Sequence, residues 1–239
     1  MSNEREFSKL FSSKKPIIGM IHLAGRKKED KVTRALEELA IYDQEGVSGA
    51  IIEDYHGSSE DVEETLRQSN GRFNLVLGIN VLRNPYGAFK LAADYGARFV
   101  QFDSVQTKDL DLSLYENMRG AFPNILVLGG VGFKYISPTG NPLEIDLEEG
   151  KSRCEAIVTT GDGTGMETPL EKLRQYQELL RDFPLIVGAG VNLRNVCEQL
   201  QVCDGAIVGS YFKPEGNTQL PVDRMKVRDL IHIVGKMRD

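Results

Sequence analysis

The sequence has few cysteines. It also lacks the features that are typical of a secreted or membrane-spanning protein. The three cysteines, Cys154, Cys197 and Cys203, form neither a C-x-x-C motif nor an even set for a disulfide framework. The N-terminus lacks the apolar core of a signal peptide, and no apolar segment approaches the length of a membrane span. We therefore expect a reduced, cytoplasmic protein without an integral membrane segment.

The sequence also lacks an excess of positive charge. Its formal net charge is −6, and the basic runs at residues 14–15 and 26–28 are short. Nucleic acids and anionic membranes attract proteins through blocks of lysine and arginine. The charge pattern therefore argues against both as partners and leaves small molecules, or a second copy of the chain in a homo-oligomer.

No linker or low-complexity segment divides the chain. Its 239 residues are close to the typical length of a (β/α)₈ barrel, and the 41% hydrophobic content is enough for a core of that size. We therefore expect one domain that covers residues 1–239.

Short apolar runs alternate with helical patterns along the whole chain. The runs have the length of strands that are buried on both faces, and they lie at residues 17–21, 49–52, 75–79, 98–102, 125–128, 156–159, 185–187 and 206–208. This alternation predicts a (β/α)₈ TIM barrel, with an open doubly wound sheet as the alternative. A short amphipathic helix over residues 4–12, with Phe7, Leu10 and Phe11 on one face, is expected to plug the bottom of the barrel.

Several helix starts can be predicted from capping residues. Ser58 or Ser59 can cap one helix, and Asn84 followed by Pro85 predicts another with proline at its first position. The run Thr168-Pro169-Leu170-Glu171 has the pattern of a capping box. The longest irregular stretch, residues 129–142, is a candidate lid.

Glycines follow the last two predicted strands. Gly188 and Gly190 precede Val191 after the first, and Gly209 precedes Ser210 after the second. Paired glycine loops at this place form the phosphate site of many (β/α)₈ barrels, and Asn192 and Ser210 could cap helices that point at it. We expect a phosphate site here; the alternative is two tight turns that merely require glycine.

Polar side chains follow the other predicted strands. In a (β/α)₈ barrel these positions form one ring around the active site. Such a ring suits a divalent metal held by oxygen ligands, or acid–base chemistry by a carboxylate and a lysine. The candidate catalytic residues are Glu53, Asp103, Lys134 and His22, and the candidate substrate-binding residues are Asp54, Asn80, Arg83, Thr160 and Asp162.

Each candidate also has a structural interpretation. Glu53 could form an ion pair with Lys134 or Arg83, and His22 could be a hydrogen-bonded structural histidine. The glycine-rich run at residues 160–165 matches neither a Walker loop nor a dinucleotide-binding fingerprint. We interpret it as a flexible loop beside the phosphate site.

The sequence resembles the BtpA/SgcQ family at stretches spread over almost the whole chain. The most specific is LGINVLRN at residues 77–84; the others are IGMIHL (18–23), GVSGAIIEDY (46–55), AIVTTG (156–161) with Thr164-Gly165, GAGV (188–191), and DGAIVGS (204–210) with Lys213. The resemblance implies a barrel of the ribulose-phosphate-binding group. One branch of the family is tied to photosystem I biogenesis, and another lies near sugar-uptake genes.

The chain departs from the family pattern in three places. The proline-rich turn expected after His22 is replaced by the run at residues 24–27, and the loop after the fourth predicted strand lacks its glycine motif. After the fifth strand, the family's aspartate and downstream histidine are missing, and only Lys134 survives. These losses weaken a family-type metal or acid–base role at the fifth strand.

Two functions are compatible with these features. The first is an enzyme, a lyase, isomerase or hydrolase, that acts on a small phosphorylated metabolite such as a sugar phosphate or a nucleotide-like compound. The second is a non-catalytic assembly or regulatory protein that retains the phosphate site. No cofactor is predicted with certainty, although a divalent metal ion would fit the carboxylates.

Overall fold

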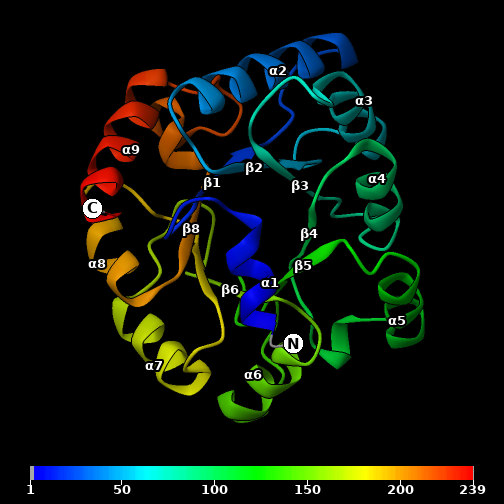
Figure 1. Ribbon diagram of the computed structural model, residues 1–239, viewed down its shortest axis with the longest axis vertical. Coiled ribbons are helices and arrows are strands. Elements are labelled where there is room, and N and C mark those ends of the chain that lie inside the picture. Colours follow the sequence, from blue (N-terminus) through cyan, green and yellow to red (C-terminus); the bar gives the residue numbers. More distant parts are fainter. Residues whose placement is uncertain (1–2, 239) are drawn as a thin grey trace.

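The protein is a closed barrel of eight parallel strands (Figure 1). The computed structural model describes the backbone of residues 3–238 and the side chains from Glu6 to Arg238. The strands are β1 Ile17–Ile21, β2 Gly49–Glu53, β3 Val76–Asn80, β4 Phe99–Phe102, β5 Leu126–Gly130, β6 Ala156–Thr160, β7 Leu185–Gly188 and β8 Gly205–Val208. The predicted (β/α)₈ barrel is confirmed, and the open doubly wound sheet is excluded.

Helices surround this barrel, and α1 lies across one end of it (Figure 1). Within the described residues, none of them is both long and apolar enough to cross a membrane. The helices are α1 Asn3–Leu10, α2 Lys28–Gln44, α3 Ser59–Ser69, α4 Gly87–Tyr95, α5 Leu112–Ala121, α6 Leu143–Lys151, α7 Leu170–Leu180, α8 Val196–Val202 and α9 Arg224–Arg238, with 3₁₀ turns η1 Thr107–Asp109, η2 Ser210–Phe212 and η3 Pro214–Gly216.

Strand pairing places the loops after β7 and β8 beside each other. Val187 in β7 is paired with Ala206 in β8. Strand β1 closes the barrel on the other side of β8, where Ile18 is paired with Ile207. The loops that follow β7, β8 and β1 are therefore consecutive around one end of the barrel.

The interior of the barrel is a separate apolar cluster that α1 closes from below. Its buried members come from α1 and the residue that follows it, from the strands and from the loop after β5: Phe7, Phe11, Ile18, Met20, Ile51, Phe99, Leu128, Phe133, Ala156, Val158, Ile186 and Ile207. The ring of Phe11 lies 6.2 Å from that of Phe99, the first residue of β4. The predicted plug at the N-terminal end of the strands is confirmed, with Phe7 and Phe11 buried and Leu10 partly buried.

Helix α3 begins as the sequence predicts, but two other predicted starts are wrong. The Ser58 hydroxyl accepts a hydrogen bond from the Asp61 backbone N–H and caps α3. Helix α4 begins only at Gly87, after Tyr86, so Pro85 is not its first residue. The side chain of Asn84 instead accepts a hydrogen bond from the Gly87 N–H and forms a turn before the helix.

The predicted capping box of α7 is also wrong. The helix begins at Leu170, with Pro169 at the cap position and no side-chain cap. The hydroxyl of Thr168 donates to the carbonyl of Gly188 at 2.8 Å, and this contact ties the start of α7 to the end of β7. The Thr168 side chain, which the local pattern predicts as a helix cap, therefore forms a long-range hydrogen bond instead.

Candidate functional site

Asn80 joins two carboxylates at the C-terminal end of the barrel. It is the last residue of β3 and is paired with Glu53, the last residue of β2. Its side-chain amide donates to Glu53 Oε1 at 3.2 Å and to Asp103 Oδ1 at 2.9 Å. The Gln101 side-chain amide also donates to Asp103 Oδ1, at 3.2 Å. The structure thus brings Glu53, Asn80 and Asp103 into one hydrogen-bonded group, which we call the carboxylate group.

Burial changes the acidity of Glu53. The side chain is almost fully buried, and the loss of hydration raises its pKa from 4.5 to about 8. The ammonium of Lys134 lowers this pKa, whereas the negative charges of Asp103 and Asp54 raise it. Glu53 therefore holds a proton near neutral pH and can release it under a modest change of environment, as a general acid or base requires.

Lys134 faces this group from the loop after β5. Its backbone N–H donates to Thr160 Oγ1 at 2.6 Å, and its ammonium lies 4.7 Å from the centre of the Phe133 ring. Neither Lys134 nor Arg83 forms a salt bridge with Glu53 in the described chain, so the structural ion pair expected as an alternative is not formed. Lys134 acts on Glu53 through its charge, without a salt bridge between them.

Two predicted substrate-binding side chains hold loops in place. Asp54 is buried, and its Oδ1 accepts from the Leu82 N–H at 2.8 Å in the loop after β3. Thr160 is also buried and donates to the carbonyl of Gly161 while it accepts from Lys134. Both residues therefore shape the site through the backbone around it.

The structure does not join Arg83 and Asp162 to the carboxylate group. Both side chains are exposed, and within the described chain neither forms a hydrogen bond or ion pair with Glu53, Asn80 or Asp103. The charge of Asp162 instead raises the pKa of Lys172 on α7, against the larger lowering that burial causes. A substrate contact by Arg83 or Asp162 remains a prediction.

His22 follows β1 and lies against the loop after β8. A β-carbon on Gly209 would lie 3.0 Å from His22 Cε1 and 3.2 Å from Nε2. Burial lowers the pKa of this histidine to about 3, and the charges of Lys213, His56 and Lys134 contribute. The imidazole is therefore neutral at physiological pH, and its buried Nδ1 has no hydrogen-bond partner within the described chain.

Three loops meet where the phosphate site is predicted. Gly190 has a φ of +66°, and a β-carbon there would lie 2.4 Å from the backbone N and Cα of Glu167 in the loop after β6. A β-carbon on Gly165 in the same loop would lie 3.2 Å from Ser210 Oγ. The loop after β7 therefore meets the backbone of the loop after β6, and the loop after β8 approaches that same loop through the Ser210 side chain. Binding of an anion by Gly188, Gly190, Val191, Gly209 and Ser210 remains a prediction.

The helix caps predicted at this site are wrong. Helix α8 begins at Val196 after Asn195, and the side chain of Asn192 accepts from the Arg194 N–H outside the helix. Ser210 is the first residue of the short turn η2, which follows Gly209. Any anion here would be held by loop N–H groups, the Ser210 hydroxyl and neighbouring side chains.

The sequence analysis missed a buried ion pair behind the phosphate loops. Lys213 Nζ donates to Glu38 Oε1 at 2.5 Å, and both side chains are almost fully buried. Burial lowers the pKa of Lys213 and raises that of Glu38. The partners are 175 positions apart, so no local pattern could pair them. The family resemblance at Lys213 was the only signal.

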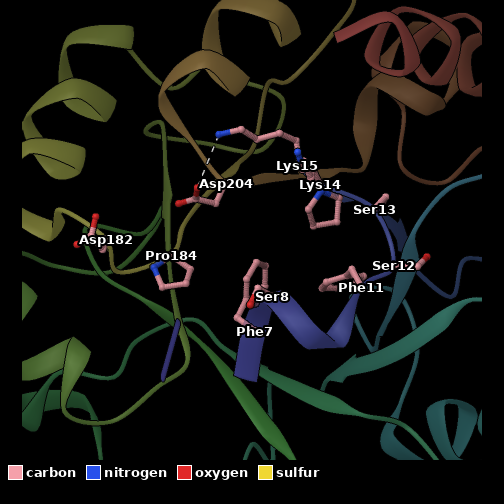
Figure 2. Close-up of a pocket in the computed structure, with 11 residues that line it drawn as sticks. Phe7, Ser8, Phe11, Ser12, Ser13, Lys14, Lys15, Asp182, Pro184 and Asp204 are labelled. Atoms are coloured by element: carbon pink, nitrogen blue, oxygen red, sulfur yellow. Dashed lines mark ion pairs between the residues drawn. The ribbon is translucent and has the colours of Figure 1, made fainter. Parts of the chain in front are cut away.

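Cavities open at both ends of the barrel. One of about 190 Å³ adjoins the carboxylate group, and its lining includes Asn80, Asp103, Leu82, Phe102 and Ile136. Another, of about 360 Å³, lies at the opposite end beside α1, and Figure 2 shows Phe7 and Phe11 on one side of it. Lys15 and Asp204 line this second cavity, 3.7 Å apart. The first cavity has two members of the carboxylate group, Asn80 and Asp103, in its lining.

The described carboxylates do not gather with other acidic, histidine or cysteine side chains into a cluster of three. Within residues 3–238, no three histidine, cysteine, aspartate or glutamate side chains come together as ligands for one ion. Glu53 and Asp103 are instead bridged by the amide of Asn80.

Fold and site together define a (β/α)₈ barrel with a titratable carboxylate group at the C-terminal end of its strands. Solved structures share this fold: the TM-score is 0.63 to phosphoribosylanthranilate isomerase from Pyrococcus furiosus, at 15% identity over 93% of this chain and 99% of that one. The TM-score to thiamine phosphate pyrophosphorylase from the same organism is 0.66, at 17% identity over 94% of this chain and 97% of that one.

The comparisons support membership of the BtpA/SgcQ family, with divergence at about 25% identity. The model of the BtpA family matches residues 125–236. The photosystem I biogenesis protein BtpA of Synechocystis is 25% identical over 95% of this chain and 90% of its own length. The uncharacterized protein MJ1115 of Methanocaldococcus jannaschii is 25% identical over 94% and 97%, and the putative sgc region protein SgcQ of Escherichia coli is 26% identical over 69% and 66%.

Proposed function

We propose that this protein is an enzyme that acts on a small phosphorylated metabolite, with Glu53 as the residue that exchanges a proton with the substrate. The observation that carries the proposal is the buried carboxyl of Glu53, whose pKa is raised to about 8 at the end of β2. A carboxylic acid that titrates near neutral pH is costly to maintain and is common at sites of proton transfer. Two barrels of the same fold bear the names of enzymes of phosphorylated compounds, which supports the substrate class.

The residues around Glu53 have complementary roles in this proposal. The phosphate of the substrate binds to the loops after β7 and β8, and the reacting carbon or oxygen then lies near Glu53. Asn80 fixes the orientation of the carboxyl through its hydrogen bond to Oε1. The ammonium of Lys134 stabilises negative charge that develops on the substrate, and neutral His22 offers a hydrogen bond without adding charge. Binding energy from the remote phosphate orients the reacting end.

A non-catalytic role is the second candidate. Strand β5 ends in Gly129 and Gly130, so it contributes no polar side chain to the ring. The Synechocystis relative is named for photosystem I biogenesis rather than for a reaction. A barrel that binds a phosphorylated ligand to control assembly would need the phosphate loops and would not need the proton exchanged by Glu53.

A ligand screen followed by one substitution separates these candidates. Phosphorylated metabolites that raise the melting temperature, with and without Mg²⁺, are first identified and then tested for turnover. For an enzyme, Glu53→Gln is expected to retain ligand binding and to lower kcat by about 10²–10⁴-fold, since it removes the proton but keeps the shape. Glu116→Gln, on the exposed face of α5, is the matched control.

Gly209→Val tests the phosphate loops in the same assay. The added side chain would collide with His22 and should abolish stabilisation by inorganic phosphate. Turnover by Glu53→Gln at the wild-type rate would remove Glu53 from the mechanism. Ligands that bind through Gly209 but never react would favour the assembly role.

A further inference from the structure

A second cleft opens at the same end of the barrel as the carboxylate group. Its volume is about 480 Å³, and it lies between the loops after β1, β2 and β8 and the first turns of α2. Its lining is Ala24, Gly25, Arg26, Asp30, Arg34, His56 and Gln219. None of these residues belongs to the carboxylate group or to the predicted phosphate loops.

Two arginines in the lining give this cleft a positive charge. The Arg34 guanidinium donates to the carbonyl of Gln219 at 2.7 Å, and Arg26 is exposed. Neither arginine forms a salt bridge in the described chain. Asp30 is the single acid in the lining, and it accepts from the Lys27 N–H at 3.3 Å.

Two buried acids near the cleft, on α2 and α3, have cationic partners, whereas the exposed Glu29 and Glu37 on α2 form no salt bridge in the described chain. Glu38, one turn beyond Arg34, accepts from Lys213 and from the Val222 N–H. Asp61 is paired with Lys31 at 3.0 Å. Within the lining itself, two arginines accompany one carboxylate, and this balance suits the binding of an anion.

The cleft is connected to the phosphate loops through His22. The His56 N–H donates to the carbonyl of His22 at 3.0 Å, and the His56 ring is within hydrogen-bonding distance, 2.9 Å, of the Thr218 hydroxyl. The His22 ring lies against Gly209 on the opposite side. One residue thus contacts the loop after β8 with its ring and the wall of the cleft with its backbone.

We propose that this cleft is a second anion subsite, and that the substrate carries two anionic ends. One end, a phosphate, binds to the loops after β7 and β8; the other, a phosphate or a carboxylate, binds to Arg26 and Arg34. This inference rests on the proposed function, because it extends the same substrate across the mouth of the barrel. It narrows the substrate class to small metabolites that have a second acidic group at the end remote from the phosphate.

Binding of a matched set of six-carbon sugars tests this inference. Fructose 6-phosphate has one anionic end, 6-phosphogluconate adds a carboxylate, and fructose 1,6-bisphosphate adds a second phosphate. Dissociation constants are measured by calorimetry for the wild-type protein and for Arg26→Gln, Arg34→Gln and Gly209→Val. Arg174→Gln, on the exposed surface of α7, is the control for loss of one positive charge.

The wild-type protein should bind at least one two-ended sugar more tightly than fructose 6-phosphate. Arg34→Gln should weaken that ligand by about 10- to 100-fold, the value of a charged hydrogen bond, and leave fructose 6-phosphate unchanged. Arg26 also carries a positive charge in the cleft but does not donate to the Gln219 carbonyl as Arg34 does. Arg26→Gln should therefore also weaken binding of the two-ended sugar. The preferred second group, carboxylate or phosphate, identifies the chemistry of the remote end.

Equal binding of all three sugars, or wild-type affinity in both arginine variants, would overturn the second subsite. In that case, loss of phosphate binding in Gly209→Val would leave the proposed function standing. If binding of the two-ended sugars depends on the arginines but not on Gly209, two hypotheses fail: that one substrate spans both sites, and that the loops after β7 and β8 bind phosphate.

Discussion

At the scale of residues, the polar ring is predictable in its membership but not in its contacts. The C-terminal ends of neighbouring parallel strands share one edge, so Glu53, Asn80 and Asp103 had to lie close together. The sequence does not show that Asn80 bridges the two carboxylates or that Glu53 is almost fully buried. Both depend on how the loops cover the strand ends, and that is decided by packing.

The raised pKa of Glu53 predicts a pH dependence of stability. The folded state keeps this proton up to a pKa of about 8, whereas the unfolded chain releases it near the ordinary value of 4.5. The contribution of Glu53 to the free energy of unfolding is therefore fully present below pH 4.5. It is lost as the pH rises from 4.5 to 8, by at most ~1.4 kcal/mol per pH unit. Glu53→Gln should flatten this part of the profile, measured by urea unfolding between pH 5 and 8. Wild-type and variant profiles that stay parallel would show that Glu53 is not the source.

The buried pair of Lys213 and Glu38 predicts a strong asymmetry between single and double substitutions. Lys213→Met leaves Glu38 without its cation in a dry environment and should cost about 3–5 kcal/mol. Glu38→Gln in the same chain removes the stranded charge and keeps an acceptor for the Val222 N–H, so most of the loss should be recovered. Urea unfolding of the two single variants and the double variant measures the coupling. Additive losses would show that the pair does not act as a unit.

At the scale of elements, strands were predictable and several helix starts were not. Each strand is an apolar run buried on both faces, and a run of that length between helical patterns is typical of a parallel strand. A cap depends on one side chain that can also bond elsewhere, and Thr168 bonds to the Gly188 carbonyl instead of α7. Local propensity therefore fails where a loop is tied to a distant strand.

Contact between the loops after β6 and β7 predicts different effects for two glycines. Gly190 and Gly216 both have positive φ, at +66° and +73°. A β-carbon on Gly190 would overlap the Glu167 backbone, whereas one on Gly216 would meet no atom within 4 Å. Gly216→Ala should cost only the backbone strain of about 1–2 kcal/mol.

Gly190→Ala adds an overlap with the backbone to that strain. It should cost at least twice as much as Gly216→Ala and should release the loop at residues 161–168, because backbone atoms cannot rotate out of the way. Urea unfolding gives the cost, and limited proteolysis within 161–168 reports on the loop. Equal costs and unchanged cleavage in the two variants would show that the loops move independently.

At the scale of the whole molecule, the barrel has two apolar layers with different roles in packing. The outer layer joins strands to helices and depends on many elements. The inner layer is a column of side chains inside the barrel. Phe7 and Phe11 close it at the N-terminal ends of the strands, and Phe133, in the loop after β5, packs on it at the C-terminal ends. The lower closure was predictable from the amphipathic pattern of α1. The upper one was not, because Phe133 follows a strand in an irregular loop.

Closure at opposite ends predicts additive losses of stability but different effects on the site. Phe11→Ala and Phe133→Ala each remove a buried ring from the column, and each should cost about 3 kcal/mol. The two rings lie at opposite ends of the strands, so the double variant should equal the sum within about 0.5 kcal/mol.

Of these two rings, Phe133 is linked to Glu53 through Lys134, whose ammonium lies over the Phe133 ring and lowers the pKa of Glu53. Phe133→Ala should therefore change the pH profile of unfolding between pH 5 and 8, whereas Phe11→Ala should lower stability equally at every pH. Urea unfolding of the single and double variants at several pH values measures both effects. Lys9→Ala, which removes an exposed side chain of α1, is the control for a substitution in that helix. A change of profile in Phe11→Ala would mean that the plug and the carboxylate group are coupled through the column, and the two ends would then have to be treated as one unit.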